Sequence, residues 1–219
     1  MKSCSTSPEE GWRKRWPEIR LAVKELSLLQ HEDQKAPTMA FLCVSKLLVN
    51  VLDEIGPTMV VLREDMQRNI ERVEEIYLSN PSIFSSLEEV LQSDVDSGLA
   101  RKGDSFSQAV LWLARSLNFS LALLEQLVKD SDASLALVVE EAYQLTIKPW
   151  HGWISRAAYK VAMKLIPERE DFVALLMKQE QDYDALKSDI KEFVSLFKPL
   201  LDEIQAILKK FRLDRLKST

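Results

Sequence analysis

The chain has 219 residues, 46% of them hydrophobic and 29% charged, with a formal net charge of −5 and a sequence pI of ≈ 5.3. This length fits one domain, or at most a domain with tails, and the composition is sufficient for a substantial core. The acidic balance argues against nucleic acid as a partner, and five glycines and eight prolines leave too little turn material for an all-β sandwich.

The cysteines and the N-terminus indicate the compartment. Cys4 and Cys43 form neither a disulfide framework nor a metal pair, which predicts a reducing environment. The N-terminus lacks an apolar signal segment, and no apolar run approaches the ~18 residues of a membrane span. We therefore expect a cytoplasmic protein that is neither secreted nor membrane-spanning.

The N-terminal part combines two helical stretches with a polar linker. Trp12 and Trp16 lie on one face of the first stretch, and Pro17 starts a helix that continues to about residue 29. We expect residues 1–36 to form an N-terminal extension with a first helix, and residues 37–213 to form the main domain. The two are either separate or one continuous domain.

Proline and glycine mark most later helix boundaries. Pro37 opens the second helix, Gly56-Pro57 starts a third over roughly 57–79, and Asn80-Pro81 starts a fourth. The predicted helices that follow span about 105–129, 133–147, 152–166, 169–178 and 181–213. The first of these is apolar almost all round, as in a central buried helix. No stretch alternates like a strand, so we expect an all-α fold with about eight or nine helices.

The third helix carries a polar stripe. Asp65, Asn69 and Arg72 lie at i, i+4 and i+7 and so share one side of the helix. This side borders the face that we expect to be buried, which includes Leu62 and Met66. An acceptor, an amide and a cation in line suit a polyhydroxyl ligand such as a sugar. The alternative is an intrahelical Asp–Arg pair that contributes little.

Two tryptophan-containing segments are candidates for a binding surface. Trp112, in the central helix, is either core or a flat platform for the C–H face of a sugar. The run Lys148–Trp153 places Trp150 and Trp153 around His151, either as a helix junction or as the rim of a binding site.

The helix after this run has a basic side. Arg156, Lys160 and Lys164 follow Trp153 at spacings that bring them near one line. An aromatic residue beside a basic stripe suits contact with an anionic membrane surface, and the alternative is an ordinary solvated face.

Enzyme signatures are missing from the sequence. It has no phosphate loop, dinucleotide fingerprint, nucleophile elbow, zinc-binding histidine pair or Cys-x-x-Cys motif. We therefore expect no catalysis, no cofactor and no metal.

Four motifs together resemble the glycolipid transfer protein family over about residues 37–210. They are Asp65-x-x-x-Asn69-x-x-Arg72, Trp112-Leu113-x-Arg115, Tyr143 and Trp150–Trp153. The resemblance implies a single-domain, two-layer all-α sandwich, with helices that separate to admit lipid chains. It also implies a cytosolic monomer that touches membranes transiently and moves sphingolipids between them without covalent chemistry.

The resemblance also implies roles for individual residues. Asp65 would accept a hydrogen bond from the ceramide amide and Asn69 would bind sugar hydroxyls. Trp112 would stack under the sugar, and His151 would donate to the amide carbonyl. Arg72 stands where the family usually has lysine.

The same comparison implies a membrane contact and a headgroup class. Trp153 would enter the membrane interface with Tyr143 nearby. The resemblance implies that the ceramide-phosphate-selective branch of the family carries an Arg-x-x-x-Arg pair. In this chain the two positions of that pair hold Gln108 and Trp112. This favours a glycosphingolipid ligand. The alternatives are a sphingolipid sensor or helical interaction module that transfers nothing, and a ceramide-1-phosphate carrier.

Overall fold

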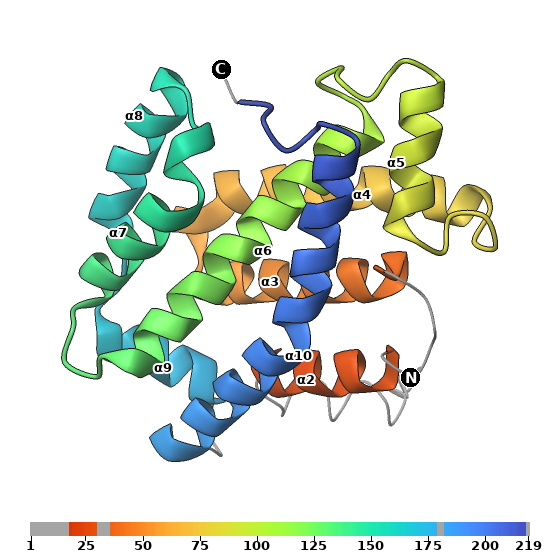
Figure 1. Ribbon diagram of the computed structural model, residues 1–219. Helices are drawn as coiled ribbons and strands as arrows, with labels where there is room; N and C mark the ends of the chain where they lie inside the picture. The colour runs from red at the N-terminus through yellow and green to blue at the C-terminus, as the bar shows by residue number, and fades with distance from the viewer. Residues whose placement is uncertain (1–17, 30–35, 179–181, 218–219) are drawn as a thin grey trace, which may run out of the picture.

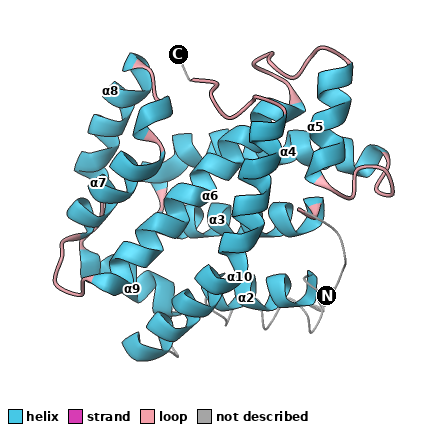
Figure 2. Ribbon diagram, in the orientation of Figure 1, coloured by secondary structure: helices cyan, strands magenta, loops and turns pink. Residues whose placement is uncertain are grey.

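This computed structural model describes residues 18–29, 36–178 and 182–217, which form helices joined by loops (Figure 1). Within these ranges the only pairing of extended backbone is one bridge between Pro37 and Ser86, and Figure 2 shows helices and loops alone. This confirms the predicted all-α class. The α-helices are α2 (Glu18–Leu29), α3 (Thr38–Ile55), α4 (Val60–Ser79), α5 (Leu87–Asp96), α6 (Phe106–Lys129), α7 (Leu135–Thr146), α8 (Trp153–Ala162), α9 (Arg169–Met177) and α10 (Tyr183–Lys210). Three short 3₁₀ turns are η1 (Pro57–Met59), η2 (Lys148–Trp150) and η3 (Met163–Leu165).

The helices form two layers that cross each other. In Figure 1, α2, α3 and α4 stack side by side in one layer, and α6 and α10 run across them in the other. Helix α6 packs against α4, α7 and α10, while α2 packs against α3 and α10. This confirms the predicted two-layer sandwich, and both layers contribute to one hydrophobic core.

The central helix is α6, as its apolar sequence predicts. It contributes buried residues to both layers, and both of its ends are held by side chains. Ser105 Oγ accepts the backbone N–H of Gln108 at 3.1 Å, and Asp94 accepts that of Ser107 at 2.7 Å. At the other end, Arg169 donates to the carbonyl of Leu127 at 2.7 Å. These bonds satisfy helix-terminal groups that would otherwise lack partners.

Helix α4 begins after a break at Gly56, whose φ of 102° favours glycine. Burial along α4 begins only at Met66. The first turn, Val60 to Leu62, is exposed, and Val61 is 77% exposed. The prediction that Leu62 belongs to the buried arc is therefore wrong, because the first turn of α4 does not face the core.

Helix α5 begins later than the sequence suggests. Asn80-Pro81 opens a turn, and Ile83 is 53% exposed. The helix starts at Leu87, where Ser86 and Glu89 form a capping box. The predicted helix start at Asn80-Pro81 is therefore wrong. Proline at N1 only permits a helix, whereas the capping box satisfies two backbone groups at once.

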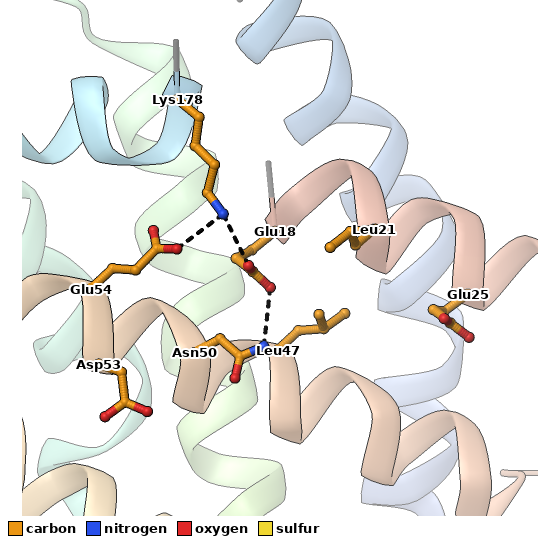
Figure 3. Close-up of a pocket in the computed structure, with 8 residues that line it drawn as sticks. All are labelled: Glu18, Leu21, Glu25, Leu47, Asn50, Asp53, Glu54 and Lys178. Carbon is orange, nitrogen blue, oxygen red and sulfur yellow. Dashed lines mark hydrogen bonds and ion pairs between the residues drawn. The ribbon is translucent and has the colours of Figure 1, made fainter. Parts of the chain in front are cut away.

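Helix α2 is pinned beside a polar cleft of about 400 Å³ (Figure 3). Lys178 Nζ lies 3.2 Å from Glu18 and 2.9 Å from Glu54, so one lysine links α2, α3 and the end of α9. Asn50 also donates to Glu18 at 3.3 Å. The expectations for Trp12 and Trp16 lie outside the described residues.

The segment from α7 to α9 lies at one edge of the molecule in Figure 1. No residue of α8 is buried. Helix α10 continues through Pro199 without interruption. Across the described ranges, no helix is both long and apolar enough to cross a bilayer.

Candidate functional site

The site is built around a cation held between two indole rings. Arg115 lies on α6 one turn after Trp112. Its guanidinium carbon is 4.6 Å from the centre of the Trp112 ring and 4.4 Å from that of Trp150. Cation–π attraction at these distances fixes both rings and joins α6 to η2. The structure therefore brings Trp112 and the Lys148–Trp153 run together, as the sequence-based hypothesis requires.

Arg115 is buried although its positive charge is only partly compensated. Its side chain is 7% exposed, and Nη2 donates to the backbone carbonyl of Asp214 at 2.9 Å. The other terminal nitrogen, Nη1, is buried without a hydrogen-bond partner among the described residues. Burial lowers the pKa of Arg115 to about 10, against an opposing effect of Asp214. The sequence held a signal for this residue, because Arg115 is the one charge between Phe106 and Leu124.

His151 lies next to the two tryptophans. Its ring centre is 6.2 Å from that of Trp112 and 5.6 Å from that of Tyr143. Its Nδ1 is 3.3 Å from the hydroxyl of Tyr143. Burial and the nearby cations Arg115 and Arg156 lower the pKa of His151. A neutral imidazole with one nitrogen engaged by Tyr143 can present the other to a ligand.

Tyr143 has a different environment from the one expected. It was assigned to the membrane contact, but it is only 4% exposed, and its ring stacks on Tyr159 at 3.5 Å between centres. This expectation needs correction, because a buried ring bonded to His151 cannot reach a membrane surface in this conformation.

Tyr159 and Glu140 complete this part of the site, and sequence reasoning missed both. The hydroxyl of Tyr159 donates to Glu140 at 2.7 Å. This bond is the largest cause of a lowered pKa at Glu140, while burial is the largest cause of a raised pKa at Tyr159. The two residues lie 19 positions apart on different helices, so helical spacing gave no signal for the pair.

The polar stripe of α4 lies on the helix that packs against α6. Asn69 is 8% exposed and donates to the backbone carbonyl of Asp65 at 2.9 Å. Asp65 is exposed and pairs with Arg68 at 3.3 Å, so the intrahelical alternative involves Arg68 instead of Arg72. Arg72 is half-buried. The carboxylate of Asp65 therefore remains accessible from solvent.

Helix α8 exposes both its aromatic and its apolar side chains. Trp153 is 78% exposed, and Ile154, Val161 and Leu165 are also exposed. The cations Arg156 and Lys160 on α8 and Lys164 on η3 are exposed as well. An exposed tryptophan among apolar and basic side chains is typical of a surface that meets a membrane or a partner.

The described ranges contain no group of three or more His, Cys, Asp or Glu residues that could hold a metal ion. We call Trp112, Arg115, Tyr143, Trp150 and His151 together the Trp112–His151 cluster. The polar cleft at Lys178 shares no lining residue with it.

The chain is similar to known proteins of one family. The model of the family described as Glycolipid transfer protein (GLTP) matches residues 36–178. Glycolipid transfer protein 3 of Arabidopsis thaliana is 41% identical over 99% of this chain and 98% of its own. A solved structure of FAPP2, described as showing how it selects simple glycosphingolipids using the GLTP-fold, is 28% identical. It superposes with a TM-score of 0.75 over 86% of this chain and 92% of that one.

A second solved structure supports the fold alone. The apo form of mouse ceramide-1-phosphate transfer protein superposes with a TM-score of 0.81, at 21% identity, over 92% of this chain and 100% of that one. The family model and a relative that is 41% identical both span most of the sequence. The chain therefore belongs to the glycolipid transfer protein family.

Proposed function

We propose that this protein carries sphingolipids between membranes without catalysis, binding the headgroup at the Trp112–His151 cluster and the hydrocarbon chains among its helices. The observation that carries the proposal is the position of Trp112 beside His151, with ring centres 6.2 Å apart. A flat aromatic surface next to a neutral imidazole suits a sugar joined to an amide, because each has a matching partner.

The headgroup site uses both layers of the fold. Asp65 accepts from the ceramide amide N–H, and Asn69 and Arg72 bind sugar hydroxyls from α4. Trp112 stacks under the sugar and His151 donates to the amide carbonyl. The burial of Asn69 supports selectivity for a sugar. Its amide nitrogen donates to the backbone carbonyl of Asp65, and a lipid without a matching hydroxyl would cover the rest of the amide without giving it a partner.

The hydrocarbon chains need an apolar chamber, because a ceramide has on the order of 30 methylenes and each costs ~0.8 kcal/mol to expose to water. Phe41 and Leu123 are buried, and Leu47, Leu48 and Phe119 pack partly buried against the same core. These residues line the chamber, which opens as the helices separate. Ile147 and Met163, both half-buried, lie toward α8 at its edge.

The membrane contact lies on α8 and η3. Trp153 inserts at headgroup depth, and Arg156, Lys160 and Lys164 face anionic lipid. The protein acts as a monomer in the cytoplasm and binds membranes only transiently.

The headgroup is a sugar rather than a phosphate. A buried phosphate needs cationic forks, and the two relevant positions on α6 hold Gln108 and Trp112. Arg115, the cation nearby, lies between two indole rings and donates through Nη2 to the backbone carbonyl of Asp214, so it offers a phosphate one free nitrogen, Nη1, and not a fork.

A vesicle-to-vesicle transfer assay tests the proposal. Glucosylceramide should move faster than ceramide-1-phosphate between phosphatidylcholine vesicles, and the reverse order would make the protein a phosphate-lipid carrier. Binding of either lipid without transfer would instead support a sensor.

A further inference from the structure

Tyr159 links α8 to α7. Although no residue of α8 is buried, the Tyr159 ring lies 3.5 Å from that of Tyr143 with an interplanar angle of 9°. Its hydroxyl donates to Glu140 at 2.7 Å. One side chain of an otherwise exposed helix therefore makes both a ring stack and a hydrogen bond with its neighbour.

The same stack leads to His151. Tyr143 presents one face to Tyr159 and its hydroxyl to His151 Nδ1 at 3.3 Å. The charged groups near His151 include Arg115 on α6, Arg156 on α8 and, beyond Tyr159, Glu140 on α7, on which Lys148 of η2 also acts. Both cations oppose protonation of the imidazole, so the ring is neutral and its two nitrogens differ.

We propose that Tyr159 is a positioning residue that couples the membrane-facing helix α8 to the ligand-facing nitrogen of His151. Tyr159, held by Glu140, fixes the Tyr143 ring so that its hydroxyl donates to Nδ1, which leaves the proton of His151 on Nε2. This inference rests on the proposed function, which assigns α8 to the membrane and His151 to the ceramide amide.

The coupling gives docking a direct effect on the ligand. Nε2–H is the donor that the amide carbonyl requires, and it is present only while Nδ1 serves as the acceptor. Movement of α8 at a membrane draws Tyr159 away from Glu140 and frees the Tyr143 ring. His151 then loses its fixed tautomer and its hold on the amide weakens. Ligand release is thereby favoured where α8 meets a bilayer.

The first experiment measures His151 directly in the ligand-free protein. Nitrogen-15 NMR reports the tautomer and the titration midpoint. The chain has two histidines, and a His31→Gln background leaves His151 as the only one that gives signals. We compare Tyr159→Phe, which keeps the stack and loses the bond to Glu140, with Tyr159→Leu, which loses both. In both variants the Nε2–H population should fall and the pKa of His151 should rise toward its ordinary value. Both effects should be larger in Tyr159→Leu than in Tyr159→Phe.

Two controls separate positioning from general disturbance. Tyr183→Phe removes a tyrosine hydroxyl whose described partners are Arg169 and Leu127, and it should leave His151 unchanged. Arg156→Gln removes a cation that lowers the pKa of His151, so it should raise that pKa without altering the tautomer. An unchanged tautomer in folded Tyr159→Leu protein would overturn the proposal, whether or not the protein transfers lipid.

The second experiment tests coupling to the membrane. Bicelles of phosphatidylcholine with phosphatidylserine, free of glycolipid, should alter the His151 signals of the unsubstituted protein and leave those of Tyr159→Leu unaffected. Glucosylceramide transfer by Tyr159→Leu should slow about fivefold, the worth of one hydrogen bond. Equal responses to bicelles in both proteins contradict the coupling. A complete lack of transfer by the unsubstituted protein contradicts the proposed function instead, and leaves the NMR comparison to decide the role of Tyr159.

Discussion

The guanidinium carbon of Arg115 lies 4.4 Å from the centre of the Trp150 ring, which links the central helix to the turn that precedes His151. The residues are 35 positions apart in the chain, and cation–π attraction holds them together. Arg115 thus acts on His151 in two ways: it anchors the adjacent Trp150, and its charge lowers the pKa of the imidazole.

Replacing Arg115 should separate its electrostatic role from its packing role. Arg115→Met keeps an unbranched apolar chain in place of the arginine methylenes and removes the buried charge. The free energy of unfolding should therefore change by no more than about 1–2 kcal/mol, while the pKa of His151 rises. Arg115→Lys keeps the charge and should preserve most of the lowered pKa. Denaturant unfolding measures the stability, and NMR titration measures the pKa of His151. An unchanged pKa of His151 in Arg115→Met would refute the electrostatic role of Arg115.

His151 should make the stability of the protein depend on pH. Its pKa in the folded state is lowered below the ordinary value of about 6.5. The unfolded chain therefore binds a proton more readily, and stability is complete above pH ~6.5 and falls as the pH drops from there toward the folded-state pKa. His151→Gln should lose this dependence. Urea unfolding at a series of pH values measures it, and parallel curves for both proteins would contradict the assignment.

Asp65 should matter for transfer and not for folding. Because Asp65 is exposed and pairs with Arg68 on the protein surface, Asp65→Val should change the free energy of unfolding by at most about 1 kcal/mol. It should abolish transfer of glucosylceramide, since the amide acceptor is lost. Arg68→Gln breaks the same ion pair and is the matched control, which should transfer normally. Loss of transfer in both variants would assign the effect to the ion pair.

The exposed side of α8 should control docking. Trp153→Ala should slow transfer while binding of a soluble short-chain glycolipid is kept, because the lost step is partition into the interface. Changing Arg156, Lys160 and Lys164 together to Gln should remove the effect of salt, which screens charges beyond a Debye length of about 10 Å. The gain from anionic lipid is at most about 1 kcal/mol per residue. If salt slows the triple variant as much as the unsubstituted protein, the docking surface lies elsewhere.

The sequence predicted those parts of the molecule that depend on neighbours within one helix. The α-helical class, the buried α6 and the common face of Asp65 and Asn69 all follow from a period of 3.6 residues. The start of α5 was predicted wrongly at Asn80-Pro81, because the Ser86/Glu89 capping box, six residues later, satisfies two backbone groups and proline satisfies none.

Contacts between helices could not be read in the same way. The sequence marks Arg115 as unusual, a lone charge in an apolar stretch, but it does not say which rings enclose it. Likewise Tyr143 looks like an interfacial aromatic until Tyr159 is seen to cover it. These arrangements depend on how α7 and α8 pack, which is set by tertiary structure.

The absence of a buried residue in α8 has a further consequence for local stability. Helix α6 is capped at both ends and buried along its length, so its amide hydrogens should exchange with solvent only on global unfolding. Helix α8 can detach without uncovering any core residue of its own, so its amides should exchange many times faster. We therefore expect the α8 edge to open more readily than the core, and we expect a hydrocarbon chain to enter there while the rest of the fold stays intact.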